Sequence, residues 1–175
     1  NVVVKYVEKY TGEEIPNPDG TSSRETKEGH EGDRYTTERK VFEDYVLEEV
    51  PANADGNMPG GTTEVIYEYK HISGGVIENH IDKATGMQLI EETKHEGYVG
   101  EDYTTAPKDF ANFDLVEEEY PSNATGKFQV EEQRVTYYYI QKASVTVRYV
   151  DENNNDIIYE GEPTKETKTG HVGDD

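Results

Sequence analysis

Apolar and polar residues alternate with a period of two along much of the chain, a pattern typical of half-buried β-strands. In the opening VVVKYVE, Val2, Val4 and Tyr6 share one face of the predicted strand and Lys5 lies on the other. The same alternation returns in EVIYEY at 64–69, RVTYYY at 134–139 and VTVRYVD at 145–151. No segment has the 3.6-residue period of a long amphipathic helix, so the pattern predicts a mainly β protein.

A glycine-containing segment lies between the predicted strands and occurs three times. It reads EGHEGDRYTT at 28–37, HEGYVGEDYTT at 95–105 and, in shortened form, TGHVGDD at 169–175. Its glycines would turn the chain, and the following Asp33 or Glu101 would place negative charge at the first amides of a short helix. The next aromatic residue, Tyr35 or Tyr103, is expected to anchor in the core. We interpret the segment as a crossing between two pairs of strands.

The recurrence extends to most of the chain and divides it into repeats of about 70 residues. PANADG at 51–56 corresponds to PSNATG at 121–126, and VVVKYVE corresponds to VTVRYVD. The equivalent segment VIENHID, at 76–82, has lost much of the alternation. We predict these domains: a complete repeat at 1–70, a second at 71–142, and the N-terminal half of a third at 143–175.

Each predicted repeat has two strands, a short helical or irregular crossing and two further strands, in the order ββ(α)ββ. A second strand fits around Ile15 in the first repeat, where it continues polar and edge-like through SSRETKE at 22–28, and around Ile157 and Ile158 in the third. This order suits a small β-grasp (ubiquitin-like) sheet with the first and last strands in the centre. A β-sandwich needs about seven strands, more than such a repeat supplies. The expected fold class is α+β, mainly β.

The repeats are long enough to carry their own cores, so we expect tandem small domains arranged as an elongated rod. The junctions KHISGG at 70–75 and IQKAS at 140–144 are short and are not Gly/Ser tethers. Limited hinge freedom is expected, with Gly74 and Gly75 making the first joint the looser one.

The third segment is shorter than the roughly 40 residues at which a domain usually folds unaided. We therefore expect it to be truncated or to be completed by another chain. A solution mass of twice the monomer would support completion by another chain, and a monomeric, frayed C-terminus would contradict it.

The composition indicates a folded, strongly acidic protein and excludes several kinds of partner and chemistry. Only 32% of residues are hydrophobic, and 38 Asp and Glu against 17 Lys and Arg give a formal net charge of −21. The 14 tyrosines and the periodic segments indicate a folded rather than a disordered acidic chain. Such a surface repels nucleic acid and anionic membranes, while cations and basic proteins remain open as partners. The absence of cysteine excludes disulfides, thiolate zinc sites and thiol catalysis.

No apolar run approaches the roughly 18 residues of a membrane span. The chain opens on a predicted strand rather than on a signal peptide, so it is expected to be soluble as given, and this start is compatible with an internal piece of something longer.

For the residues that could act in catalysis or metal binding, the sequence context favours structural roles. His30 and His171 lie in the repeated GHxG, but Tyr98 occupies the same place in the second repeat, so imidazole chemistry is not a property of the repeat. Glu48-Glu49 and Glu117–Glu119 resemble paired catalytic carboxylates, but neighbours in a strand point to opposite faces, and we interpret them as a solvated strand face. Motifs for catalysis, phosphate binding and cofactors are not found, so no enzyme activity and no cofactor are predicted.

The segment DENNNDIIYEGE, at 151–162, is the nearest approach to a calcium loop. Asp151, Asn153 and Asn155 occupy alternate positions and Glu162 is the twelfth residue, but Asp156 stands where such a loop needs glycine. We predict a hairpin turn there and leave a weak ion site as the alternative. Asn123 begins a formal glycosylation sequon inside the PxNAxG turn.

Taken together, VTVRYVDENNNDI, GEDYTT, PSNATGKF and QRVTYYY closely resemble the MucBP (mucin-binding protein) repeats of Gram-positive cell-surface proteins. The resemblance covers both complete repeats and the partial third; it is strongest over 95–151 and weakest over VIENHID. It implies a β-grasp domain, repeated in tandem on an extracellular, wall-anchored adhesin, with mucin glycoproteins proposed as ligands for some members.

Our leading hypothesis is a non-catalytic adhesin module that binds mucin-like glycans of host or environmental glycoproteins weakly and many times over. Tyr10, Tyr120 and Tyr138 lie off the predicted inward faces and are the candidate sugar-stacking residues. The other partners expected are neighbouring repeats of the same protein, without direct membrane contact. The alternative is a stalk that projects a separate binding domain from the cell wall.

Overall fold

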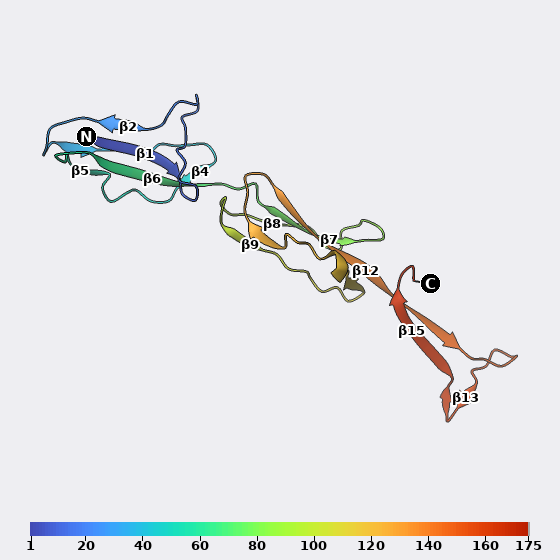
Figure 1. Cartoon of the computed structure of the whole chain (residues 1–175). Coiled ribbons are helices and arrows are strands. Elements are labelled where there is room, and N and C mark those ends of the chain that lie inside the picture. Colours follow the sequence, from blue (N-terminus) through green and yellow to red (C-terminus); the bar gives the residue numbers. More distant parts are fainter. Residues whose placement is uncertain (175) are drawn as a thin grey trace. The chain divides into compact units, whose positions relative to one another are not determined.

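The computed structural model describes residues 1–174, whose contacts group into two units (Figure 1). The first comprises Asn1–Val76, Lys94–Tyr103 and Gly126–Gln133; the second comprises Ile77–Thr93, Thr104–Thr125 and the chain from Arg134 onward. The division passes through the second predicted repeat, so the units differ in extent from the predicted domains, whose boundaries stay a prediction.

A four-stranded sheet forms the centre of the first unit. Its strands are β1 (Val2–Glu8), β2 (Glu25–Lys27), β4 (Tyr45–Leu47) and β6 (Thr63–His71). Their order is β2-β1-β6-β4, and the neighbours β1 and β6 run parallel (Figure 1). β2 and β4 pair antiparallel with the two outer edges of this central pair. For this repeat, the prediction that the first and last strands are central is therefore confirmed.

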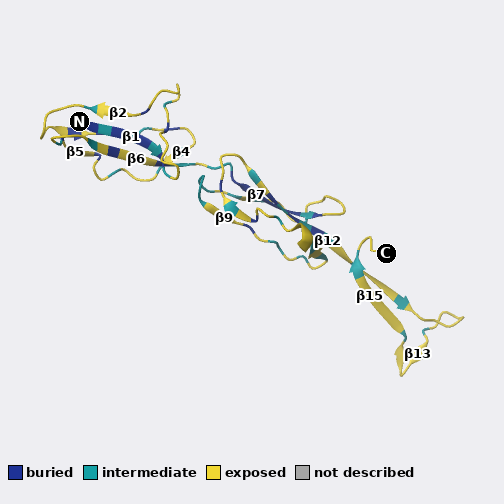
Figure 2. Ribbon diagram, in the orientation of Figure 1, coloured by how far each residue is buried: buried dark blue, intermediate teal, exposed yellow. Residues whose placement is uncertain are grey.

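The predicted inward faces form the core of the first unit. Buried and less buried residues alternate along β1 and β6, as Figure 2 shows. Tyr6 stacks on Tyr67 with 5.3 Å between ring centroids, and Phe42 packs edge-on against Tyr6. Burial of these large side chains is the main stabilising contribution, because each removes 150 Å² or more from water.

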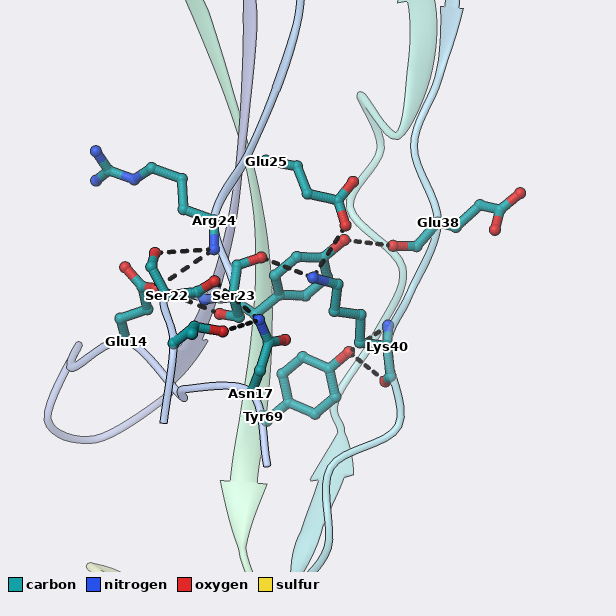
Figure 3. Close-up of polar contacts among 11 residues, drawn as sticks. Glu14, Asn17, Ser22, Ser23, Arg24, Glu25, Glu38, Lys40 and Tyr69 are labelled. Carbon is teal, nitrogen blue, oxygen red and sulfur yellow. Dashed lines mark hydrogen bonds and ion pairs between the residues drawn. The ribbon is translucent and has the colours of Figure 1, made fainter. Parts of the chain in front are cut away.

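The second strand of the first repeat forms in the later part of the predicted segment, within SSRETKE. Ile15 is buried and its amide donates to the Tyr6 carbonyl at 2.9 Å beside the isolated bridge Val7–Glu14, but the turn around it forms no strand. The Glu14 carboxylate accepts hydrogen bonds from Ser22 and the Ser23 amide, which ties this turn to the start of β2 (Figure 3). Three consecutive polar residues then pair with β1, because an edge strand needs little apolar surface.

A five-stranded sheet lies mostly in the second unit. Its strands are β7 (Val76–Asp82), β8 (Thr93–His95), β10 (Phe113–Leu115), β12 (Gln133–Arg148) and β15 (Lys165–His171). Their order is β10-β12-β7-β8, and β15 pairs with β12. β12 passes without interruption through the predicted junction at 140–144. The expectation that this junction is not a flexible tether is confirmed.

β7 is buried along nearly its whole length, on both faces. Glu78, His80 and Asp82 occupy the positions that correspond to Val4, Tyr6 and Glu8 of β1. Ile77 and Asn79, on the opposite face, are buried as well. The weak alternation of VIENHID therefore reflects a strand that is covered on two sides.

The crossing contains no helix. In each repeat the acidic residue after the second glycine accepts a hydrogen bond from the amide three residues earlier, which closes a tight turn. The donor amides and acceptor carboxylates are His30 and Asp33, Tyr98 and Glu101, and His171 and Asp174. Of the two predicted forms of the crossing, the short helix is therefore wrong and the irregular form is confirmed, as is the mainly β class. Among residues 1–174 the single helical segment is the 3-10 turn η1 (Glu117–Glu119).

Sequence reasoning missed two pairs of short strands, which are β3 (Arg34–Thr36) with β5 (Asp55–Asn57) and β9 (Asp102–Thr104) with β11 (Thr125–Lys127). It predicted a strand at β13 (Ile158–Tyr159) but missed its pairing with β14 (Glu162–Pro163). The Tyr35 ring lies against Gly56 across the first pair, and Tyr103 lies against Gly126 across the second. Both tyrosines are buried, which confirms the prediction that they anchor in the core.

The threonines of the crossing segment fix the PxNAxG turn to the central strand. Thr37 Oγ1 donates to the Ala54 carbonyl at 2.8 Å and lies 2.8 Å from Tyr67 Oη. Thr105 makes the corresponding contacts in the second repeat. The repeated segment is thus a folding signal, because its tyrosine, threonine and acidic residue each satisfy a structural contact.

A second hydroxyl holds the loop that covers the core. Tyr69 Oη donates to the Lys40 carbonyl at 2.7 Å and accepts from the Lys40 amide at 3.1 Å (Figure 3). Lys40 Nζ in turn donates to the Ser23 carbonyl and pairs with Glu25. Burial raises the pKa of Tyr69, so the hydroxyl stays protonated and keeps its donor role at neutral pH.

Substitution of Tyr69 with phenylalanine is expected to lower the free energy of unfolding by about 1 to 2 kcal/mol, because both backbone groups of Lys40 lose their partner. Urea denaturation followed by far-UV circular dichroism would measure it. Tyr159→Phe, at an exposed position, is the matched control and should change nothing. Equal midpoints for both variants would contradict the role of this hydroxyl.

The third segment has little core of its own. Val145 and Tyr149 correspond to Val2 and Tyr6, yet they are 63% and 42% exposed. β15 covers one edge of β12, and no strand within residues 1–174 pairs with the other edge along 143–148. The prediction that this segment is incomplete or is completed by another chain remains open.

The first junction is tightly packed. An added Cβ at Gly74 would lie 2.4 Å from Glu132 N and 2.7 Å from Val130 O. The Gly75 carbonyl accepts from the Gln133 amide at 3.0 Å. The expectation that these glycines loosen the joint is not supported, because Gly74 is needed for close backbone approach.

Across residues 1–174, no helix is long and apolar enough to span a bilayer.

Candidate functional site

The candidate Tyr10 lies in the first unit at the junction of two predicted repeats. Its side chain is 46% exposed, and its ring packs against Gly100. Tyr10 Oη donates to Glu101 Oε1 at 3.3 Å, and Lys9 Nζ lies 5.9 Å from the ring centroid. One part of the ring is therefore held by the protein and the rest faces solvent.

The candidates Tyr120 and Tyr138 belong to the second unit. Tyr120 is 46% exposed and packs edge-on against the buried Tyr137 with 5.6 Å between centroids. Tyr138 is half-buried on the outward face of β12. Within residues 1–174, no hydrogen bond or ring contact joins Tyr120 to Tyr138.

The second unit contains an open groove of 560 Å³ beside β12. Phe110, Phe113 and Tyr139 supply aromatic surface, and Lys108 and Lys142 supply amines. Phe110 packs edge-on against Tyr139, with 5.0 Å between centroids, which fixes the ring at the base of the groove. The volume lies within the range of small-ligand sites. Sequence reasoning missed this groove, because its residues come from separate segments.

The rim of the groove carries a charged network. Asp114 pairs with Lys142 at 3.2 Å and with His171 Nε2 at 3.1 Å. The hydrogen bond from His171, followed by that from Lys142, holds the pKa of Asp114 below its usual range. Lys108 Nζ lies 3.6 Å from the buried Glu78 carboxylate. The groove therefore presents both amines and carboxylates, suited to neutral polar ligands with many hydroxyls.

His80 is an unexpected buried group in the second unit. Its ring stacks on Tyr137 at 5.4 Å, as Tyr6 stacks on Tyr67 in the first repeat. Nε2 lies 3.6 Å from Glu78 Oε1. Burial lowers the pKa of His80, and the nearby Glu78 carboxylate partly opposes that shift. Alignment of VIENHID with VVVKYVE would have identified the exchange of tyrosine for histidine.

The other histidine and acidic candidates lie at the surface or in structural contacts. The His30 side chain is 99% exposed, which confirms a surface role, and His171 binds Asp114 in the second unit. Glu117–Glu119 is exposed but forms a 3-10 turn, so its interpretation as a strand face is wrong. Glu48 forms ion pairs with Lys9 and Lys70.

The segment 151–162 forms two short turns. Asp151 Oδ1 accepts from the Asn153 and Asn155 amides, and Val150 bridges to Asp156, which confirms the predicted hairpin turn. Glu162 belongs to the separate β13–β14 pair. Within the described residues no group of three or more His, Asp or Glu side chains is arranged to hold a metal ion.

The family model and the related proteins that match this chain agree with each other. The MucBP domain model matches residues 1–70, 76–140 and 144–175. Internalin J of Listeria monocytogenes serotype 4b (strain F2365) is 34% identical over 180 residues, covering 99% of this chain and 18% of the relative. Internalin J of serovar 1/2a (strain ATCC BAA-679 / EGD-e) is 33% identical, with 99% and 20% coverage. The chain thus spans about a fifth of the length of these relatives.

Two solved structures match with a TM-score of 0.29 each: Streptococcal High Identity Repeats in Tandem (SHIRT) domains 3-4 from cell surface protein, and Mub-RV. They are 11% and 12% identical and cover 80% of this chain, with 98% and 97% of their own lengths matched. A TM-score this low supports no structural inference. The family model and the relatives at about one-third identity agree with the repeated folding contacts, and the chain belongs to the MucBP domain family.

Proposed function

We propose that the chain is a non-catalytic repeat module of an extracellular bacterial adhesin and that it binds mucin-type or other glycoproteins. The observation that carries the proposal is the MucBP match along nearly the whole chain. The similarity to Listeria Internalin J supports a place on the surface of a Gram-positive bacterium, and attachment to the cell wall is part of the proposal.

Two kinds of surface would contact sugars. Tyr10 and Tyr120 each expose about half of an aromatic side chain, on which the apolar face of a sugar ring can stack, and Tyr138 offers a smaller area. The groove at Phe110 and Lys142 adds hydrogen-bonding groups around an aromatic base. Each contact is weak alone, and repetition along the protein would raise the apparent affinity through avidity.

Binding of the chain to purified mucin and to a glycan array at physiological salt tests the proposal. Serine substitution at Tyr10, Tyr120 or Tyr138 is expected to weaken binding roughly 2- to 10-fold each, the equivalent of one lost aromatic contact. Tyr159→Ser is the matched control, because Tyr159 is an exposed tyrosine on the short strand β13, outside the three candidate positions. Equal loss in all four variants would contradict the assignment, and no binding by the unmodified chain would contradict the function.

The alternative function is a stalk that projects another domain. The specific observation in its favour is β12, a strand of 16 residues that continues through the predicted junction at 140–144. The close packing of Gly74 at the first junction also favours a stalk, because it restricts motion of the chain there. Absence of glycan binding, together with an elongated shape in small-angle X-ray scattering, would favour the stalk.

We also propose that the predicted domains 1–70, 71–142 and 143–175 are the folding units and that the complete ones have a β-grasp topology without an α-helix. The parallel central pair β1 and β6, flanked by antiparallel β2 and β4, supports this topology.

A further inference from the structure

The first junction contains a short antiparallel pairing between the end of one repeat and the crossing turn of the next. Ile72 bridges to Tyr98, the Val99 amide donates to the His71 carbonyl at 2.8 Å, and the Ser73 amide donates to the Gly97 carbonyl at 3.1 Å. These residues all belong to the first unit. The crossing turn therefore acts as an edge to which the preceding strand end is attached.

The second junction repeats the same pairing inside the second unit. The Val172 amide donates to the Gln141 carbonyl at 2.9 Å, and Lys142 and Ala143 pair with His171 and Gly170. Val172 corresponds to Val99, and Gln141 corresponds to His71. The pairing thus occurs twice in the same register, with different side chains, so it depends on the backbone of the turn.

The side chains at the two junctions differ in chemistry. At the first, Lys70 Nζ lies 5.2 Å from the Tyr98 ring centroid and 3.9 Å from Glu101. At the second, His171 Nε2 contacts Asp114, a residue of the preceding repeat. The pairing is therefore common to both junctions, and the side chains give each junction its own specificity.

The first repeat has the same turn with its pairing groups exposed. Gly29, His30 and Glu31 correspond to Gly97, Tyr98 and Val99, and all three are exposed, whereas their counterparts in the second repeat are half-buried. Within residues 1–174 no hydrogen bond engages the Glu31 amide or the Gly29 carbonyl. The turn itself is fully formed, because the Asp33 carboxylate accepts from the His30 amide.

We propose that Gly29–Glu31 is an interaction surface that accepts the end of the last strand of another MucBP-type repeat placed ahead of it. The Glu31 amide donates to that strand's carbonyl at the Gln141 position, and the Gly29 carbonyl accepts from its amide at the Ala143 position. The inference concerns assembly between repeats and does not depend on glycoprotein binding.

The chemistry of the turn indicates which strand end it prefers. His30 and His171 each lie beside the carboxylate of their own turn, at 3.5 and 3.8 Å. His171 contacts Asp114 through its remaining nitrogen, while His30 is fully available. The matching partner therefore carries an acidic residue at the position of Asp114, as the second repeat does.

A chain extended by a copy of residues 71–143 joined ahead of Asn1 tests the proposal. Hydrogen exchange followed by NMR should show the Glu31 amide protected at least tenfold relative to the unextended chain. Asp114→Ala in the added copy should remove part of this protection, about 2- to 10-fold. Ala143→Pro in the added copy, which lacks the donor amide for Gly29, is the control and should abolish it.

Protection of residues 134–139 in the added copy would show that the copy is folded. An unchanged exchange rate of the Glu31 amide in that folded chain would overturn the proposal. If the added copy does not fold, an extension of residues 139–143 alone supplies the pairing segment at high effective concentration. In this shorter extension, the Glu31 amide is expected to exchange 2- to 5-fold more slowly than in the same extension carrying Ala143→Pro. Equal exchange rates in the two chains would overturn the proposal. Strong protection of Glu31 in the unextended chain would also overturn it.

Discussion

Replacement of Gly74 with alanine is expected to lower the free energy of unfolding by about 3 kcal/mol, near the upper end for an overpacked site. The new Cβ would lie 2.4 to 2.7 Å from backbone atoms of Val130, Glu131 and Glu132. Backbone cannot rotate away as a flexible side chain can, so the junction or the 130–132 loop must shift. Urea denaturation would show a lower midpoint with an unchanged m-value.

Gly61→Ala is the matched control for Gly74→Ala. An added Cβ at Gly61 meets no atom within 4 Å, and the backbone there has no positive φ. Its substitution should leave the stability within about 0.5 kcal/mol of the parent or raise it slightly. Similar denaturation midpoints for the two variants would show that the backbone around Gly74 can shift at little cost and that its close packing does not contribute to stability.

Acidification below pH 6.5 is expected to destabilise the second unit through His80. Burial places the pKa of His80 in the folded chain below its unfolded value, so the unfolded state binds the proton more readily. The stabilisation is complete above pH 6.5 and decreases as pH falls toward the folded pKa, by up to about 1.4 kcal/mol per pH unit. Chemical denaturation at several pH values between 4 and 7.5 would measure the slope.

Substitution of His80 with tyrosine, the residue at the corresponding place in the first repeat, isolates this effect. The variant keeps the stack on Tyr137 and removes the imidazole at position 80, so its pH dependence of stability lacks the contribution of that group. Tyr6→His is the reciprocal variant and should gain the dependence that His80→Tyr loses. Identical slopes for the parent chain and His80→Tyr would exclude His80 as the cause.

The core of the first repeat was predictable from its sequence. Val2, Val4 and Tyr6 fell on the buried face, because a period of two assigns faces without knowledge of the neighbours. The anchoring of Tyr35 was also predictable, since an aromatic residue that recurs with its glycines favours a packing role. Its position over Gly56 was not, because that contact depends on which short strands pair.

The errors came from interactions that single-sequence patterns do not describe. Asp33 satisfies an amide that a helix start would also offer, so the sequence does not distinguish a tight turn from a short helix. The inward face of β7 cannot be recognised from the sequence, because Glu78 and His80 stand where apolar residues are expected. Glu78 is stabilised in the buried position by an ion pair with Lys108, and His80 by its stack on Tyr137.

The candidate site was the least predictable part. Exposure of Tyr10 and Tyr120 followed from their positions off the inward faces, but the groove beside Phe110 and Lys142 requires the tertiary arrangement of two segments, 107–117 and 139–142. The pairing at the junctions likewise involves backbone groups, which leave no mark in side-chain composition.

The parallel pairing of β1 with β6 has a mechanical consequence for a chain under tension. The N-terminal end of β1 and the C-terminal end of β6 lie at opposite ends of the pair, with Val2 opposite Thr63 and Glu8 opposite Tyr69. Force applied at the two ends of this repeat therefore loads the interstrand hydrogen bonds in shear, all together rather than one after another.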